Sequence, residues 1–132
     1  MKLRVLSETP SGGWTTLRLI SKERADSLVP APSAAEFSGS VGSLLFDRSK
    51  AVMVAGLGAS VGVGDSAVRR AAGTAALELR KRGFLKVLLD LGDWVDHAEA
   101  AVEGFVLGAY RFDVFLSKRS APISELGVVV KK

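Results

Sequence analysis

Apolar residues alternate with polar ones in two stretches near the start of the chain, and this pattern predicts two β-strands. Residues 1–8 alternate Lys, Leu, Arg and Val, whereas residues 14–20 are rich in Thr, Leu and Ile. Between them, the segment Thr-Pro-Ser-Gly-Gly at residues 9–13 is typical of a turn. We therefore expect the first two strands to form a hairpin.

Two short apolar runs follow an irregular stretch. Residues 22–43 contain two prolines among Ser and Gly, which predicts a long loop with one helical turn at residues 23–28. Residues 44–46 and 51–55 are apolar and are separated by turn-forming residues, so we expect two short strands. The second run, Ala-Val-Met-Val-Ala, has no polar residue, which is typical of a strand buried on both faces of a sheet.

A helical period begins at residue 65 and predicts a helix over residues 65–82. Its apolar positions recur at helical intervals, namely Val68, Ala71, Ala72, Ala75 and Leu79. We interpret Asp65 as the N-cap residue and Gly83 as the C-terminal cap, because a short acceptor side chain and a glycine are favoured at those two ends.

The rest of the chain continues the alternation of strand and helix. Residues 84–91 and 123–130 read as strands, and residues 96–112 carry a second helical period. Asp96 and Glu99 match a capping arrangement at the start of that helix. Alternating strands and helices favour parallel pairing, so we expect a single α/β domain over residues 1–132, with a mixed sheet flanked by helices.

Composition excludes several classes of protein. The 132 residues are 48% apolar and 24% charged, as in an average globular domain. No cysteine is present and only one histidine, which excludes a disulfide scaffold, a Cys-based zinc site and any site that needs two histidines. The chain has neither a signal-peptide pattern nor an apolar run of about 18 residues, so we expect no membrane span and a cytoplasmic location.

The net charge of +4 and a pI near 9.7 raise the question of nucleic-acid binding. The basic residues form small groups: Arg69 and Arg70, Arg80 to Arg82 with Lys86, Lys118 and Arg119, and Lys131 and Lys132. We interpret these groups as solvated helix faces and ends, with a phosphate-binding stripe as the alternative. Aromatic residues, on which bases could stack, are scarce.

A glycine-rich loop lies between the buried strand and the first long helix. Its glycines are Gly56, Gly58, Gly62 and Gly64. Such a loop could present backbone N–H groups to a phosphate, although its spacing matches neither the dinucleotide fingerprint nor a P-loop. Asp65 at the start of the helix would repel an anion. We interpret the loop as a connecting turn, with a ligand loop as the alternative.

Two further groups of residues could carry chemistry. The carboxylates Asp90, Asp93, Asp96 and Glu99 recur every three residues and could hold a hard cation such as Mg²⁺, but we expect helix capping and solvation instead. His97 is the only histidine, and we expect it to be a surface residue rather than half of a catalytic dyad. We therefore assign no catalytic residue and no metal ligand to this chain.

Four segments resemble the leucyl (cytosol) aminopeptidase family. Residues 52–58, Val-Met-Val-Ala-Gly-Leu-Gly, are similar to the family's strand and Gly-Leu-Gly turn, and residues 69–76 are similar to its next helix. Residues 103–113 resemble the pattern Glu-Gly-x-x-Leu-Gly-x-Tyr-x-Phe that closes the last long helix of the family's N-terminal domain. Residues 37–42 also look like a family feature. Where the family often continues Tyr-Lys, this chain has Phe-Leu at 115–116.

The resemblance implies a macro-domain-like fold and a non-catalytic, structural role. In the family, catalysis belongs to a separate C-terminal domain with two divalent metal ions, and no Asn-Thr-Asp-Ala-Glu-Gly-Arg motif occurs here. The implied partners are that catalytic domain and other copies of the chain in a hexamer. Two alternatives remain. One is a macro-like module that binds ADP-ribose through the glycine-rich loop, and the other is a DNA-binding module, because some bacterial members of the family bind DNA.

Overall fold

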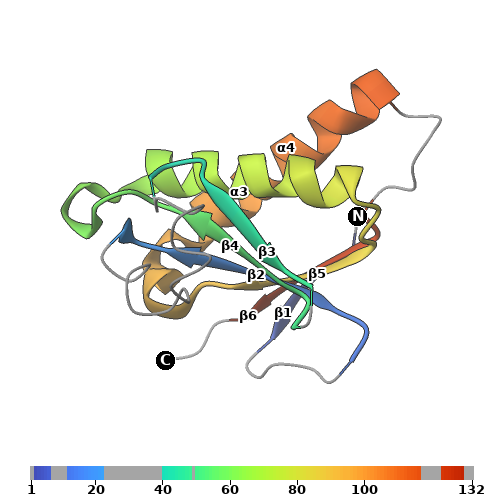
Figure 1. The fold of residues 1–132 in the computed structure, drawn as a ribbon, viewed down its shortest axis with the longest axis horizontal. Coiled ribbons are helices and arrows are strands. Elements are labelled where there is room, and N and C mark those ends of the chain that lie inside the picture. The colour runs from blue at the N-terminus through green and yellow to red at the C-terminus, as the bar shows by residue number, and fades with distance from the viewer. Residues whose placement is uncertain (1, 7–11, 23–39, 49, 117–122, 130–132) are drawn as a thin grey trace.

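The computed structural model describes residues 2–6, 12–22, 40–48, 50–116 and 123–129. These residues form a six-stranded sheet in the order β1-β6-β5-β2-β4-β3, and Figure 1 shows two long helices on one side of it. The strands are β1 (Lys2–Leu6), β2 (Thr15–Ile20), β3 (Leu44–Asp47), β4 (Val52–Gly56), β5 (Lys86–Asp90) and β6 (Glu125–Val129). The helices are α3 (Asp65–Lys81) and α4 (Ala98–Leu116), with short 3-10 helices η1 (Ser60–Gly62) and η2 (Gly92–His97).

The sheet is mixed, as expected. Strands β1, β6, β5, β2 and β4 are paired in parallel, and β3 is antiparallel to β4. The two apolar runs at residues 44–46 and 51–55 therefore become neighbouring strands, and the later strands alternate with α3 and α4. The helical turn predicted at residues 23–28 lies outside the described residues.

The predicted hairpin between the first two strands is wrong. Strand β1 pairs with β6, whereas β2 pairs with β4 and β5, and both run in the same direction, which a hairpin forbids. The reason lies at the other end of the chain. In β6 the four residues from Leu126 to Val129 are all buried, so this strand needs a neighbour on each side, and β1 supplies one of them.

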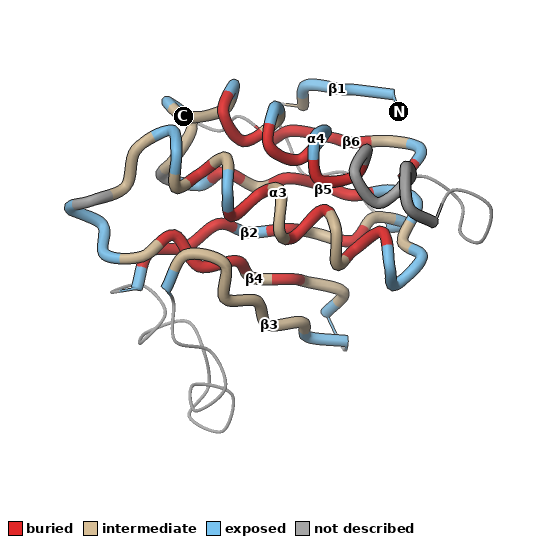
Figure 2. Tube along the Cα trace, turned by 90° about the horizontal axis from the view of Figure 1, so that it is seen from above, coloured by how far each residue is buried: buried red, intermediate tan, exposed pale blue. Residues whose placement is uncertain are grey.

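The core lies between the sheet and the two helices. Rows of apolar side chains cross the sheet, and one of them consists of Met53, Leu17, Leu89 and Val128, each at most 3% exposed. Helix α3 covers this face with small side chains, namely Ala71, Ala72, Ala75 and Ala76. Figure 2, in which buried residues are red, shows this layer beneath both helices. The alanines let α3 approach the strands closely.

The opposite face of the sheet is more polar. Along β2, Arg18 is exposed between the buried Leu17 and Leu19, which face the helices. Apolar residues are also buried on this face, namely Leu88 and Val129 at 1% exposure each, and a small second cluster of Ile20 with Leu45 and Val54. Strand β4 is therefore fully buried on its helix face and half-buried on the other, among the residues that the structure describes.

Both helix starts differ from the prediction. The N-cap of α3 is Gly64, with no side-chain cap, and Asp65 is the first helical residue. Asp96 lies inside η2, and α4 begins at Ala98. The C-terminal end of α3 is as expected: Gly83 has φ of +81° and its N–H donates to the carbonyl of Arg80 at 3.0 Å. Within the described ranges, no helix is long and apolar enough to cross a membrane.

Candidate functional site

The glycine-rich loop leaves the carboxyl end of β4 and is tied to its neighbours by main-chain hydrogen bonds. The N–H of Gly56 donates to the carbonyl of Ser43 and that of Leu57 to Ile20, both at 2.9 Å. Gly58 has φ of +84°, which favours glycine, and its carbonyl accepts a bond of 2.8 Å from the N–H of Lys22. The N–H groups at the start of the loop are thus used within the fold.

The start of α3 carries a carboxylate at the place where a phosphate would sit. Asp65 occupies the first turn, and its Oδ1 lies 2.7 Å from Nδ1 of His97. A helix N-terminus attracts anions, but a carboxylate already held there competes with one. These contacts favour the connecting role for Gly56, Gly58, Gly62 and Gly64, and binding of a nucleotide by the loop stays a prediction.

The His97–Asp65 contact joins two residues that no sequence pattern had paired. His97 lies at the end of η2, 32 residues from Asp65, and its side chain is 25% exposed against 65% for the aspartate. The ring of Trp94 packs at a tilt of 45°, with ring centroids 6.2 Å apart. His97 is a partly exposed residue, and in addition it links the beginning of α3 to the segment that leads into α4.

We expect this link to add modestly to stability. In a double-mutant cycle of His97→Ala and Asp65→Ala, the coupling energy should be about 0.5–1 kcal/mol, as for a single hydrogen bond on a partly exposed pair. Chemical denaturation of the four proteins measures it. The pair of Glu78 in α3 with Arg82 at the end of that helix, at 3.3 Å, is the matched control. Additive effects of the two substitutions would show that the contact contributes nothing.

The described carboxylates at residues 90–99 do not form a metal-binding group. Asp90 accepts a hydrogen bond from the N–H of Gly92 at 3.2 Å and lies 3.7 Å from Nε of Arg18, so it closes a turn and balances a charge. Asp96 lies in η2 and Glu99 in α4. The side chain of Asp93 lies outside the described residues. Among the described side chains, no three His, Cys, Asp or Glu residues are placed to hold one metal ion.

The basic groups are partly used inside the fold. Arg80 is 1% exposed, so this member of its group is buried rather than solvated. Arg82 lies over the ring of Phe46, 5.1 Å from its centroid, and pairs with Glu78. Lys118, Arg119, Lys131 and Lys132 lie outside the described residues. DNA binding through these groups stays a prediction.

Helices α3 and α4 approach each other closely where they cross. A Cβ atom built on Gly104 would come within 2.8 Å of Cα and carbonyl carbon of Arg69, closer than real Cβ atoms come. One built on Gly108 would meet the backbone of Gly73 in the same way, at 2.8 Å from its Cα. Arg69 then pairs across the crossing with Glu103, with Nε 3.0 Å from Oε1. The two helices are in backbone contact because glycines occupy the contact points.

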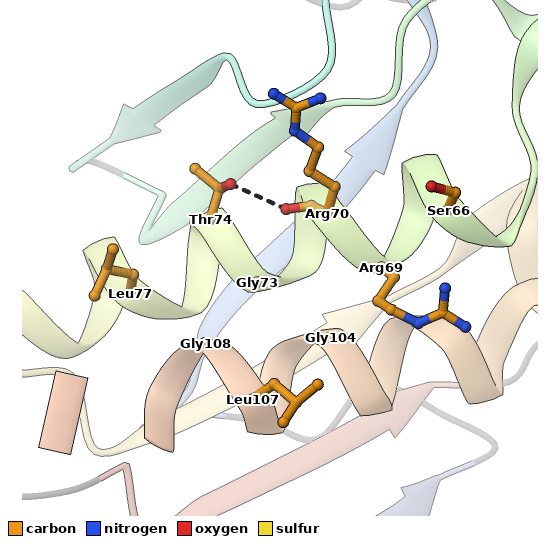
Figure 3. A pocket seen from close by; sticks show the side chains of 9 residues that line it. All are labelled: Ser66, Arg69, Arg70, Gly73, Thr74, Leu77, Gly104, Leu107 and Gly108. Carbon is orange, nitrogen blue, oxygen red and sulfur yellow. Dashed lines mark hydrogen bonds between the residues drawn. The ribbon is translucent and has the colours of Figure 1, made fainter. Parts of the chain in front are cut away.

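Two surface hollows lie beside these helices. The first, of about 470 Å³, lies over the crossing, and Figure 3 shows Arg69, Arg70, Thr74 and Leu107 around it. In it the Thr74 hydroxyl donates to the carbonyl of Arg70 at 3.0 Å. The second, of about 410 Å³, lies between β1 and α4 and is lined by Leu3, Val5, Ala98, Glu99, Val102, Glu103 and Val128. Its floor is almost wholly apolar.

Comparison with known proteins gives the chain a family. The family model for the cytosol aminopeptidase family, N-terminal domain, matches residues 14–119. The chain belongs to the cytosol aminopeptidase family. The match is to the N-terminal domain, as the resemblance of residues 52–58, 69–76 and 103–113 implied.

Curated relatives agree with this assignment. The chain is 41% identical over 104 residues, 77% of its length, to a probable cytosol aminopeptidase of Nocardia farcinica (strain IFM 10152). It is 42% identical over 74 residues, 54% of its length, to one of Rhodococcus jostii (strain RHA1). These alignments cover 18% and 13% of the relatives, so the chain spans less than a fifth of either protein.

Solved structures support the fold. A mutant of tomato leucine aminopeptidase superposes with a TM-score of 0.74 at 16% identity, over 98% of this chain and 32% of that structure's chain. The bottromycin maturation enzyme BotP in complex with Mn gives 0.69 at 22% identity, over 90% of this chain. The mixed sheet with its helices is therefore the fold of this family's N-terminal region.

The family assignment explains the glycines at the helix crossing. Gly104 and Gly108 are the two glycines of the segment 103–113 that resembles the family pattern, and both lie against α3. The sequence contained this motif but did not indicate what its glycines do. The structure shows that these positions allow the two helices to approach to backbone contact.

Proposed function

We propose that this domain is a non-catalytic, structural part of an aminopeptidase of the cytosol aminopeptidase family. The observation that carries the proposal is the match of residues 14–119 to the N-terminal domain of that family. The fold supports it, because the described polar groups mostly serve the fold itself: Asp90 closes a turn, and Asp65 and Glu103 link helices.

The proposal extends to the rest of the parent protein. There, a C-terminal catalytic domain would bind two divalent metal ions and use them to hydrolyse the bond after an N-terminal residue. This domain would pack on the catalytic domain and support a hexamer. Its location would be the cytoplasm, and its fold would be of the macro-domain type. None of these activities would reside in the residues described above.

The first test is a peptidase assay of this chain. With Mn²⁺, Mg²⁺ or Zn²⁺ and a chromogenic leucine anilide, we expect no release above that of a mock preparation. The Nocardia farcinica relative is the positive control for the assay conditions. Chelator-sensitive release by the purified chain would contradict a non-catalytic role.

The structural role needs a separate measurement. We would replace the corresponding N-terminal segment of the Nocardia farcinica relative with this chain, and compare the chimera with a deletion of that segment. Light scattering after size exclusion should show the oligomer of the relative for the chimera and a smaller species for the deletion. If the deletion keeps its oligomeric state, the domain does not support assembly.

A further inference from the structure

We propose that the edge of β1 with which no described strand pairs binds an extended segment of a separate protein, which adds to the sheet as a further strand with alternating apolar and acidic residues. The proposal does not depend on the aminopeptidase role. It rests on the exposure of β1, on the hollow beside it and on an imbalance of charge along it. Figure 2 shows β1 at the margin of the sheet in the colour of exposed residues.

The rows of apolar side chains in the core continue onto β1, where the side chains are exposed to solvent. The row from Leu17 through Leu89 and Val128 ends at Val5, whose exposure rises to 69% after three residues at 3% or less. In the next row, the buried Leu126 is followed by Leu3, which is 52% exposed. Monomeric proteins usually cover such side chains or replace them on an edge strand. Together with Val102 of α4 they line the 410 Å³ hollow.

The backbone of β1 offers the bonds that an added strand needs. The N–H of Lys2 donates to the carbonyl of Ser124 next to β6, at 2.8 Å. Because successive residues of a strand direct their N–H and C=O groups to opposite edges, those of Leu3 and Val5 point away from β6. In the order of the described strands, β1 is the last at this edge. Strand addition is a common way to recognise an extended segment.

The charges on the other face of β1 indicate which kind of strand would bind beside it. Arg4 lies 3.2 Å and Lys86 4.0 Å from the carboxylate of Glu125, and Lys2 is the partner of Glu125 in the β1–β6 register. Arg4 and Lys86 therefore share one carboxylate, and Lys2 lies beside it in the register. A neighbouring strand with Glu or Asp on this face would balance them, because opposite charges on adjacent strands attract. A second copy of β1 would instead bring Lys2 and Arg4 against like charges, which disfavours self-association.

The test uses the full chain and a fluorescent peptide of alternating Val and Glu residues. Fluorescence anisotropy should show saturable binding, and a peptide of alternating Val and Lys should bind at least about tenfold more weakly. Val5→Pro removes an outward N–H without touching the bonds to β6, so it should abolish binding, whereas Val5→Thr should retain it. Circular dichroism checks that Val5→Pro is folded.

A charge swap keeps the proposal testable if Val5→Pro does not fold. Arg4→Glu should shift the preference from the Val–Glu to the Val–Lys peptide. Failure of both peptides to bind, or equal binding of both that Arg4→Glu leaves unchanged, would overturn the proposal. A dimer of the chain that is lost in Arg4→Glu or Val5→Pro would identify a second copy as the occupant instead, and would overturn it as well.

Discussion

Replacing Gly104 with alanine should lower the free energy of unfolding by about 3 kcal/mol, at the upper end of the range for overpacking a core. The added methyl group would meet the backbone of α3 at Arg69, and a backbone cannot rotate away as a side chain can. The two helices must separate, which also loosens their contact with the sheet. Thermal denaturation should show the midpoint falling by about 10 °C.

Gly73→Ala is the matched control for that substitution. It adds the same methyl group at the same crossing, but its Cβ would lie 3.1 Å from the carbonyl oxygen of Gly104, a contact that a small shift relieves. Both variants gain the same helix propensity of about 1 kcal/mol, so the control should stay within about 1 kcal/mol of the parent. Equal midpoints for the two variants would mean that the helices do not touch as described.

The second large effect is expected from Phe105→Ala. Phe105 lies in α4, is fully buried against the sheet and is among the largest side chains of the core. Removing the ring should cost about 3–5 kcal/mol, because the transfer free energy is lost and a cavity remains. Since domains of this size are stable by about 5–15 kcal/mol, the variant should be close to unfolding. Guanidinium denaturation with an unchanged slope would measure the loss.

Its neighbour supplies the comparison. Val106 is 43% exposed on the same helix, so Val106→Ala removes atoms that already touch water. Its cost should stay within about 0.5 kcal/mol. Comparable losses at the two positions would indicate that α4 packs on the sheet through a different face.

The sequence predicted most elements because their signals are local. The period of Val68, Ala72, Ala75 and Leu79 requires a helix with one apolar face, and the structure buries all four. The ends of the helices were predicted less accurately than their existence. At the start of α4, Asp96 of the expected capping arrangement lies in the 3-10 helix η2, whereas Glu99 lies in the first turn of α4.

The contacts in the candidate site could not be predicted from short segments of the sequence. The glycine-rich loop was placed correctly between β4 and α3, but the use of its N–H groups depends on Ser43 and Ile20, which are distant in sequence or in other strands. Likewise, only the fold brings His97 to Asp65. Gly104 and Gly108 belong to a motif that is visible in the sequence. Their role as contact points depends on the packing of α3 against α4, which only the structure shows.

The sequence by itself determined the α/β class, the two long helices, the family and the lack of cysteine and of a second histidine, since periodicity, composition and motifs are properties of the chain alone. Tertiary structure decided which strands are neighbours. The turn at residues 9–13 suggested a hairpin, but burial of β6 on both sides outweighed that local preference and placed β1 at the edge. Pairing between distant strands is set by the apolar area the whole sheet can bury, and no short segment encodes it.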